Sequence, residues 1–370
     1  MPASKVCFTT MRSENGESLP AKLARLAKLA GIENIDFKRK FVALKVHFGE
    51  RGNLAFPRHN YARAVADLVR ELGGRPFLTD ANTLYVGSRR NAIDHLEVAY
   101  ENGFSPLQTG CHVLITDGLK GDDEVEVPIP GGRLLQTARI GRVAMDADII
   151  VTINHFKGHM LTGVGGAVKN VGMGCGSRAG KMAMHAKGKP TIDPDACTGC
   201  RRCQKACGED AISFAAPARR AAIDPQKCVG CGRCLSACPV DAVESDFDAP
   251  AEDCHRRIAE YTLAVLHGRP HFHLNLAIDI SPDCDCMNHN DAPILPDIGL
   301  FASPDPVAID MACAEMAVAL PPLPGSKLAE CSGKGRDHFA SIHPITNWRS
   351  GLEYAEAIGL GSAAYDLVRM

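Results

Sequence analysis

Eight of the sixteen cysteines in this chain lie between residues 197 and 238, and their spacing is duplicated. Residues 192–214 and 223–245 form an internal repeat, and each half carries Ile-Asp-Pro shortly before its first cysteine. The first run, with the spacing C-x2-C-x2-C-x3-C, consists of Cys197, Cys200, Cys203 and Cys207, and the second consists of Cys228, Cys231, Cys234 and Cys238. Closely spaced thiols in such numbers indicate metal ligation, because intracellular thiols are normally reduced. The repeat therefore predicts a small unit folded around metal ligands.

The second run ends in Pro239, where the first has Gly208, and the pair of runs matches the motif with which bacterial ferredoxins bind two 4Fe-4S clusters. In that motif the fourth cysteine of each run ligates the other cluster. We therefore assign Cys197, Cys200, Cys203 and Cys238 to cluster 1, and Cys228, Cys231, Cys234 and Cys207 to cluster 2. Gly199 and Gly230 permit a close approach of the backbone to the clusters. Two zinc sites, or a decayed scaffold that no longer binds clusters, are the alternatives.

The length of the chain leaves room for a larger domain around this unit. With 370 residues, of which 45% are hydrophobic and 23% charged, the composition is typical of a soluble globular protein. We predict a discontinuous host domain of residues 1–190 and 249–370 around an inserted ferredoxin-type module at 191–248. The chain shows neither a long uncharged apolar run nor a signal-peptide pattern, so we expect a cytoplasmic protein without a membrane span. The net charge of -2 argues against a nucleic-acid partner.

Short apolar runs alternate with helical patterns on both sides of the module. This alternation predicts an α/β fold with a largely parallel sheet in the host domain and an α+β module inserted into it. The expected strands are 41–46, 76–79, 113–116, 148–153, 273–278 and 298–302. The expected helices are 21–30, 61–72, 89–102, 255–267, 306–319 and 351–358.

Polar residues follow several of these strands, at the ends where a parallel sheet binds ligands. They are His47 and Glu50, then Asp80, Asn82 and Thr83, then Asn154, His155 and Lys157, then Asp279, and finally Ser303 and Asp305. Turns and helix caps use the same residue types, and Ser303 and Asp305, which precede Pro306, are typical of a cap. We expect the recurrence to mark a ligand crevice, with Glu50, Asp80, Asn82 and Asn154 among the substrate-binding residues.

Residues 155–190 contain six Lys or Arg and nine Gly, but no Asp or Glu. We expect this segment to bind an anion through Lys169, Asn170 and Lys181, aided by glycine amides and by the N-terminus of a helix that begins near Gly166. The alternative is a basic loop that packs on negatively charged clusters. Residues 175–182 resemble a phosphate loop but lack its first glycine and its Ser or Thr, so nucleotide hydrolysis is not supported. The same cationic segment also contains a partial match to the dinucleotide-binding fingerprint, but the third glycine is missing, so nicotinamide binding is not supported.

Three histidines and a lysine are candidate catalytic residues: His47, His155, His159 and Lys157. Imidazole titrates near neutrality and can transfer protons or ligate metals. A structural role is the alternative for each histidine. Lys157 favours the neutral form of its histidine neighbours.

Cys284 and Cys286 form a second cysteine motif, after an expected strand at 272–280. Two thiols two residues apart on a loop can face one point. They are candidates for an additional metal site, a redox dithiol or a substrate contact, and Cys175 is a candidate third member. Ordinary buried thiols are the alternative.

The chain as a whole resembles the domain-of-unknown-function 362 family, whose members are commonly labelled iron-sulfur centre proteins. The matching stretches are Lys45-Val-His-Phe-Gly-Glu50, Asp80-Ala-Asn-Thr-Leu-Tyr85, Asn154-His-Phe-Lys-Gly-His159, Gly165-Gly-Ala-Val-Lys-Asn170, Met173-Gly-Cys175, Cys284-Asp-Cys286 and Ser303-Pro-Asp-Pro306. The resemblance covers nearly the full length and implies an α/β host with an inserted ferredoxin module. It implies no settled reaction.

These motifs together predict an iron-sulfur electron-transfer protein with two 4Fe-4S clusters. Our leading hypothesis is a redox enzyme that passes low-potential electrons from a soluble donor protein, through the clusters, to an anionic small molecule or cofactor in the host crevice. The alternatives are a non-catalytic electron carrier, a metallocentre-maturation adaptor that docks on another redox protein, and an iron-sulfur sensor.

Overall fold

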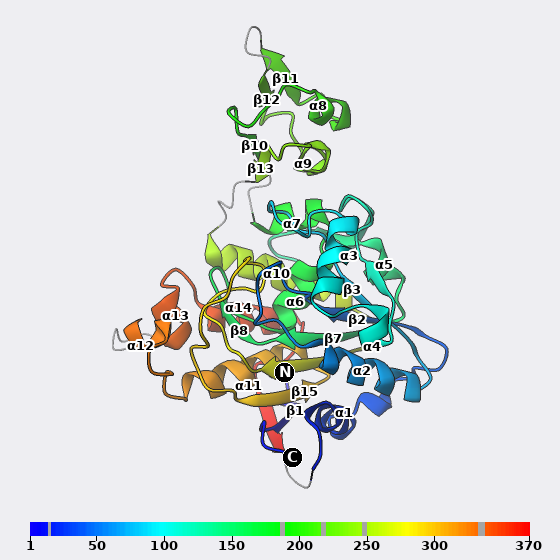
Figure 1. Ribbon diagram of the computed structural model, residues 1–370, viewed down its shortest axis with the longest axis vertical. Helices are drawn as coiled ribbons and strands as arrows, with labels where there is room; N and C mark the ends of the chain where they lie inside the picture. Colours follow the sequence, from blue (N-terminus) through cyan, green and yellow to red (C-terminus); the bar gives the residue numbers. More distant parts are fainter. Residues whose placement is uncertain (14–15, 186–188, 216–219, 246–249, 332–336) are drawn as a thin grey trace.

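An eight-stranded sheet runs through the centre of the host (Figure 1). The computed structural model describes all residues except 14–15, 186–188, 216–219, 246–249 and 332–336. The strand order is β16-β1-β15-β14-β7-β2-β3-β4, and the five neighbouring strands from β14 to β4 run parallel. These strands are β1 Ser4–Thr9, β2 Phe41–Val46, β3 Arg75–Asp80, β4 Val113–Ile115, β7 Ile149–His155, β14 His271–Ala277, β15 Gly299–Ser303 and β16 Tyr365–Arg369. The fold is therefore mixed α/β with a mostly parallel sheet, as predicted.

Helices cover both faces of the sheet (Figure 1). One face packs against α1 Leu19–Leu29, α2 His59–Glu71 and α3 Ala92–Glu101, and the other packs against α6 Ala167–Cys175, α10 Ala251–Leu266, α11 Pro306–Val318 and α14 Trp348–Ala357. Side chains alternate along β2: Val42 and Leu44 join the first core, whereas Ala43 joins the second. Lys45 therefore points toward α6. Burial of each large aliphatic side chain contributes roughly 1.5–3 kcal/mol.

Shorter elements connect this framework. The short helices are η1 Ile32–Asn34, α4 Pro106–Thr109, α5 Arg142–Asp146, α7 Arg178–His185, α12 Lys327–Cys331 and α13 His338–Ile342. Two antiparallel pairs join β5 Glu124–Pro128 to β6 Thr137–Gly141 and β8 Lys157–His159 to β9 Gly163–Gly165. The second pair and α7 flank α6, and this arrangement brings the cationic segment of the sequence to one end of the host.

All six expected strands lie in the central sheet, and all six expected helices exist with shifted ends. Sequence reasoning missed β1 and β16. The placement of Ser303 and Asp305 at the ligand edge was wrong, because β15 runs antiparallel to β14 and β1, so its end lies at the opposite edge. The cap alternative is confirmed: the Asp305 carboxylate accepts hydrogen bonds from the backbone N–H groups of Val307 and Ala308, at 2.9 and 3.0 Å.

Residues 190–245, which we call the cysteine module, form a small unit above α7 (Figure 1). Each repeat folds as strand, helix and strand: β10 Pro190–Ile192, α8 Arg202–Ala206 and β11 Ile212–Ala215, then β12 Arg220–Ile223, α9 Arg233–Ala237 and β13 Val243–Ser245. The strands pair across the repeats, β10 with β13 and β11 with β12. Gly199 and Gly230 occupy equivalent positions and have positive φ, 68° and 70°, which favours glycine. The predicted boundary at 248/249 lies outside the described residues.

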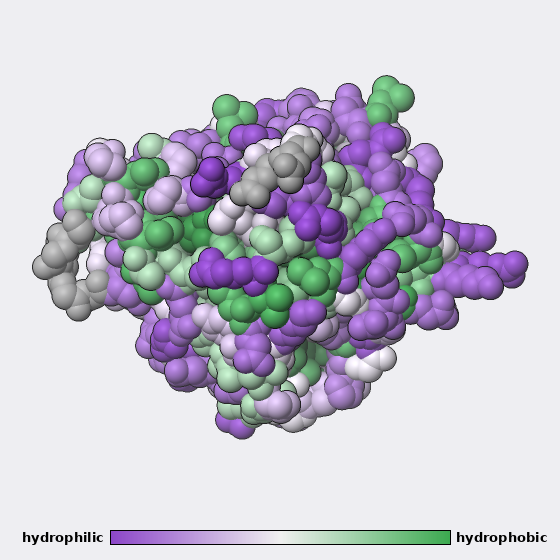
Figure 2. All heavy atoms as spheres, turned by 90° about the horizontal axis from the view of Figure 1, so that it is seen from below, coloured by the Kyte–Doolittle hydropathy of each residue, from purple (hydrophilic) through white to green (hydrophobic). Residues whose placement is uncertain are grey.

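The end of the host opposite the cysteine module has a mixed surface, on which hydrophilic side chains surround small apolar patches (Figure 2). Across the described segments, none of the helices combines the length and the apolarity needed to cross a membrane. The candidate site residues lie at the other end of the host, near α6 and α7.

Candidate functional site

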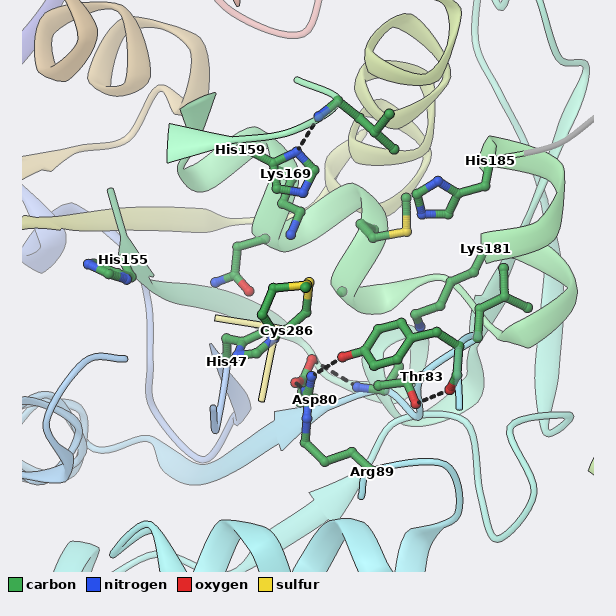
Figure 3. A pocket seen from close by; sticks show the side chains of 18 of the residues that line it. His47, Asp80, Thr83, Arg89, His155, His159, Lys169, Lys181, His185 and Cys286 are labelled. Carbon is green, nitrogen blue, oxygen red and sulfur yellow. Dashed lines mark hydrogen bonds and ion pairs between the residues drawn. The ribbon is translucent and has the colours of Figure 1, made fainter. Parts of the chain in front are cut away.

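A cavity of about 400 Å³, which we call the site pocket, opens where β2, β3 and β7 end (Figure 3). These strands are neighbours in the sheet, so residues far apart in the sequence meet there. The sequence-predicted residues that line the pocket are His47, Asp80, Thr83, His155, Lys157, His159, Lys169, Asn170, Lys181 and Cys286. Other candidates, Glu50, Asn82, Asn154 and Cys284, are buried behind the wall. Asp279 lies outside it and pairs with Arg58 at 3.5 Å.

A buried network of acidic and basic side chains underlies the pocket. Lys45 Nζ lies 2.8 Å from Asp80 Oδ1 and donates a 2.6 Å hydrogen bond to Asn170 Oδ1. Arg89 Nη1 lies 3.2 Å from Asp80 Oδ2, and Arg89 Nε lies 3.2 Å from Glu50 Oε2. Each of these charged side chains is almost completely buried, so the ionised form of each is stable only beside a partner of opposite charge. Sequence reasoning missed Lys45 and Arg89; a lone lysine in the otherwise apolar strand β2 is the signal that identifies Lys45.

The charges of this network set the protonation of nearby groups. Burial would raise the pKa of Asp80, but the charge of Lys45, aided by Arg89, outweighs it and holds this pKa well below its usual range. Burial, followed by the charge of Arg89, lowers the pKa of His47 well below its usual range. Burial, followed by the charge of Lys169, lowers the pKa of His159 to about 4. Near neutral pH, His47 and His159 are therefore neutral, which suits proton acceptors better than donors.

Asp285 anchors the loop that carries the two cysteines. Its Oδ1 lies 2.8 Å from His155 Nδ1, and its Oδ2 lies 3.1 Å from Lys157 Nζ. The other nitrogen of His155 lies 2.9 Å from the carbonyl oxygen of Ile278. Both ring nitrogens face oxygen acceptors, so His155 is held rigidly between the loop and β14. The sequence reasoning had not identified Asp285, although its position between two candidate cysteines is a usable signal.

The Cys284 sulfur lies among hydrogen-bond donors. Lys169 Nζ donates to it at 3.0 Å and the backbone N–H of Cys286 at 3.4 Å. The neighbouring Cys286 thiol, followed by the charge of Lys169 and the ring of His159, holds the pKa of Cys284 well below its usual range despite burial. The Nδ1 atom of His159 accepts two backbone N–H groups, at 3.1 and 3.2 Å, so the ring carries its proton on Nε2.

The N-terminus of α6 already holds an anion from the protein itself. The Asp310 carboxylate accepts hydrogen bonds from the backbone N–H groups of Ala167 and Val168, at 2.7 and 2.9 Å. A Cβ on Gly166 would lie only 2.2 Å from Asp310 Oδ1, so glycine is needed for this approach. The expectation of a helix beginning near Gly166 is confirmed, but its use for an external anion was wrong, because Asp310 takes these amides.

The asparagine side chains predicted to bind the ligand instead stabilise the pocket wall, because they form hydrogen bonds with other side chains. Asn170 Nδ2 donates to Asn154 Oδ1 at 2.7 Å, and Asn154 Nδ2 donates to Asn275 Oδ1 at 2.8 Å. Asn82 Nδ2 donates to Asp117 Oδ1 at 2.9 Å. These contacts join α6 to β7, β7 to β14, and the segment after β3 to the segment after β4, and they give the wall a fixed shape.

Lys181 enters the pocket from α7 (Figure 3). Its Nζ donates to the carbonyl oxygen of Gly176. Burial lowers the pKa of Lys181 to about 8, partly offset by the charge of Asp117. Burial raises the pKa of Asp117 itself to about 6. A lysine that titrates near neutrality can exchange a proton with a ligand.

The cysteines of the cysteine module form two groups. Cys197, Cys200, Cys203 and Cys238 line one hollow, and Cys207, Cys228, Cys231 and Cys234 line the other. Within the part of the chain that the structure describes, no three His, Cys, Asp or Glu side chains are grouped so that they could hold a metal ion. An additional metal at Cys284 and Cys286 stays a prediction.

The second hollow adjoins the site pocket. Leu84 lines the pocket and shares an apolar core with Met182, Cys234 and Leu235. A Cβ on Gly232 would lie 3.0 Å from Met182 Sδ, so the backbone of the cysteine module approaches α7 closely. Arg90 donates a 2.6 Å hydrogen bond to the carbonyl oxygen of Leu235. The cysteine module and the pocket wall are thus in direct contact.

Comparison with known proteins identifies one curated relative, the thylakoid-associated protein sll1697 of Synechocystis sp. (strain ATCC 27184 / PCC 6803 / Kazusa), at 30% identity over 171 residues. The match covers 44% of this chain and 47% of that protein, so the chain spans about half the length of the curated relative.

Two solved structures share part of the arrangement. The lactate racemase apoprotein from Thermoanaerobacterium thermosaccharolyticum matches at 14% identity and a TM-score of 0.36, covering 75% of this chain and 51% of that one. A protein from Thermotoga maritima matches at 13% identity and a TM-score of 0.35, covering 74% of this chain and 53% of that one. At these scores neither structure carries an argument about this protein.

A family model matches most of the chain. The model is described as a domain of unknown function (DUF362), and it matches residues 42–315. This range contains the wall of the site pocket, the cysteine module and Asp310. The chain therefore belongs to the DUF362 family.

Proposed function

We propose that this protein transfers electrons through two 4Fe-4S clusters, held by the cysteine module, to a small anionic molecule in the site pocket. One observation carries the proposal: the eight cysteines face two hollows, four to each, and the second hollow adjoins the pocket wall. Four thiols per hollow, one of them from the other repeat, fit the ligand set of a two-cluster ferredoxin. Such clusters supply single electrons at low potential.

The backbone of the cysteine module supports this fit. The amide of Ala221 donates to Cys197 Sγ at 3.5 Å, and the amide of Ala211 donates to Cys207 Sγ at 3.4 Å. Amide hydrogen bonds to ligand sulfurs stabilise the added negative charge of a reduced cluster and raise its potential. One of these sulfurs, Cys197 Sγ, faces the first hollow, and the other, Cys207 Sγ, faces the second.

The pocket wall favours an anionic ligand. Its Lys and Arg side chains are Arg89, Lys157, Lys169 and Lys181, whereas its acidic side chain is Asp80. A concave surface lined mainly by one sign of charge concentrates ligands of the opposite sign. Lys181, with a pKa of about 8, is the residue best suited to deliver a proton as electrons arrive.

Metal analysis and paramagnetic resonance test the proposal. Protein purified without oxygen should contain roughly eight iron and eight sulfide per chain. Cys203→Ala and Cys234→Ala should each lower the iron content and remove one reduced-cluster signal. Cys331→Ala is the matched control, because Cys331 is partly exposed and lies outside both hollows. Zinc in place of iron, or equal iron content in all three variants, refutes the cluster assignment.

A non-catalytic carrier is the second candidate, favoured by exposed apolar side chains on the cysteine module. Val229 lies within the second cysteine run and Val240 follows it, and they are 57% and 41% exposed. Such side chains fit the docking of a soluble redox protein. If Lys181→Met leaves the turnover of every small anionic acceptor unchanged while electrons still reach a partner protein, the protein is an electron carrier and the enzyme proposal is refuted.

A further inference from the structure

We propose that Cys284 and Cys286 form a redox-active dithiol that reduces the disulfide bond of a small anionic molecule in the site pocket. Cys286 belongs to the pocket wall, and Cys284 lies directly behind it, 1% exposed. Figure 3 shows Cys286 in the middle of the pocket, between Lys169 and the pair of His47 and Asp80. The inference deepens the proposed function, on which it rests for the source of its electrons.

The loop geometry turns both sulfurs to one place. The Cys286 amide donates to Cys284 Sγ at 3.4 Å, and the two thiols are close enough to shift each other's pKa, that of Cys284 downward and that of Cys286 upward. The backbone N–H of Met287 donates to the carbonyl oxygen of Cys284 at 3.0 Å and closes the turn. Asp285 fixes the turn from the other side through His155 and Lys157. A turn held on both sides keeps the two thiols within reach of each other.

The surroundings of Cys284 fit a reacting sulfur better than a packing one. Lys169 Nζ, partly buried in the wall, donates to this sulfur at 3.0 Å. Apolar residues would fill this volume at lower cost than a partly buried cation and its partner. A cation beside a thiol favours the thiolate, which is the species that attacks a disulfide. Cys313, by contrast, is a buried cysteine in the apolar core, whose pKa burial raises.

The reaction balances in two stages. The Cys284 thiolate takes the proton of the Cys286 thiol as the Cys286 sulfur attacks the substrate disulfide, and the first substrate thiolate takes this proton as it leaves. The Cys284 thiolate then attacks the Cys286 sulfur of the mixed disulfide, and the second substrate thiolate leaves and takes a proton from solvent. The S–S bond of the substrate breaks and an S–S bond between Cys284 and Cys286 forms, so two electrons pass from the two cysteines to the substrate. One electron from each of the two clusters, with one proton, restores the Cys286 thiol and the Cys284 thiolate. A pair of one-electron carriers thus matches a two-electron couple.

Two disulfides of similar size and opposite charge test the substrate class. Dithiodipropionate carries two carboxylates, and cystamine carries two ammonium groups. The reduced protein should release thiol from dithiodipropionate at least about tenfold faster, because cations line the pocket. A peptide map without reductant should then show a Cys284–Cys286 link. A map without this link, or faster reaction with cystamine, overturns the inference.

Single variants separate the two sulfurs. Cys284→Ser should stop after the first stage and carry the substrate half as a mixed disulfide on Cys286, whereas Cys286→Ser should release no thiol from the probe. Cys331→Ser, the matched control, should behave as the wild type, because Cys331 lies outside the pocket. A mixed disulfide on Cys331 in the wild type, with none on Cys286 in Cys284→Ser, refutes the assignment.

The link to the clusters has its own measurement. Reduced wild-type protein, freed of excess reductant and given one equivalent of dithiodipropionate, should lose its reduced-cluster resonance signals, whereas Cys286→Ser should keep them. If the protein forms the Cys284–Cys286 link but contains no clusters, the dithiol inference stands and the proposed function is refuted. If the protein contains two clusters but forms no link, the proposed function stands and the dithiol inference is refuted.

Discussion

Replacing Lys45 by Met removes the positive charge that the Asp80 carboxylate faces inside the host. The two groups lie 2.8 Å apart, with side chains 1% and 3% exposed. At this distance and an effective dielectric constant of about 20, their attraction is about 6 kcal/mol. Arg89 Nη1 remains 3.2 Å from Asp80 and compensates part of the loss. We therefore expect Lys45→Met to lower the free energy of unfolding by about 3–5 kcal/mol, the range for breaking a buried pair.

Lys40→Met provides the matched control, because Lys40 also faces an aspartate at the start of the same strand. Its Nζ lies 3.8 Å from Asp148 Oδ1, but the side chains are 46% and 38% exposed. Water and salt screen this pair, so its removal should cost less than about 1 kcal/mol. Urea unfolding, followed by circular dichroism at low and high salt, measures both changes. The effect of Lys45→Met should persist in salt, since buried pairs are screened less.

The double variant Lys45→Met/Asp80→Asn tests the physical cause. If the cost arises from an uncompensated buried carboxylate, the double variant should lose less stability than the sum of the single variants. An exactly additive loss would show that the two groups are not coupled. A cost for Lys45→Met no larger than that for Lys40→Met would refute the reasoning.

Three further changes have defined outcomes. Asp310→Asn places an amide donor against the backbone N–H of Val168, so urea unfolding should show a loss of about 1–3 kcal/mol. Burial raises the pKa of Asp310 to about 6, whereas its value in the unfolded chain is about 4. The folded wild-type protein therefore binds the Asp310 proton more tightly than the unfolded chain does. The stability of the wild type relative to Asp310→Asn should fall as pH rises from about 4 to 6. Lys169→Met removes a charge that lowers the pKa of Cys284, so alkylation of Cys284 should require higher pH, as mass spectrometry of the labelled peptide reports, whereas Lys169→Arg should retain most of the effect. Leu84→Glu buries a carboxylate between the cysteine module and the pocket, and it should slow re-reduction of the dithiol without changing the iron content.

Strands in the middle of the sheet were predictable, whereas its edge beyond β15 was not. Strand β2 has the predicted bounds, because a strand covered on both faces carries an apolar run that stands out locally. Strands β1 and β16 bring the two ends of the chain together, and each mixes polar with apolar residues. Their pairing depends on which distant segment completes the sheet, and local pattern carries no such information.

The site shows the same division. Side chains at the ends of parallel strands were predicted to meet, and His47, Asp80 and His155 line one pocket. Lys45 and Arg89 were missed: Lys45 is recognisable as the lone lysine of an apolar strand, but its pairing with Asp80, like that of Arg89, is set only by the fold. The N-terminus of α6 was taken for an external anion site, whereas Asp310, 143 positions away from Ala167, fills it.

The sequence alone was sufficient to predict features whose determining residues are neighbours along the chain. The cysteine spacing, the duplicated repeat and the alternation of strands and helices are such features, since a few consecutive residues determine each local shape. Tertiary structure alone decided which charges are compensated, which amides are taken and which sulfur lies beside Lys169. Those outcomes depend on contacts between segments brought together by strand order and helix packing, because electrostatic and hydrogen-bond energies depend on separation in space and burial rather than on separation in sequence.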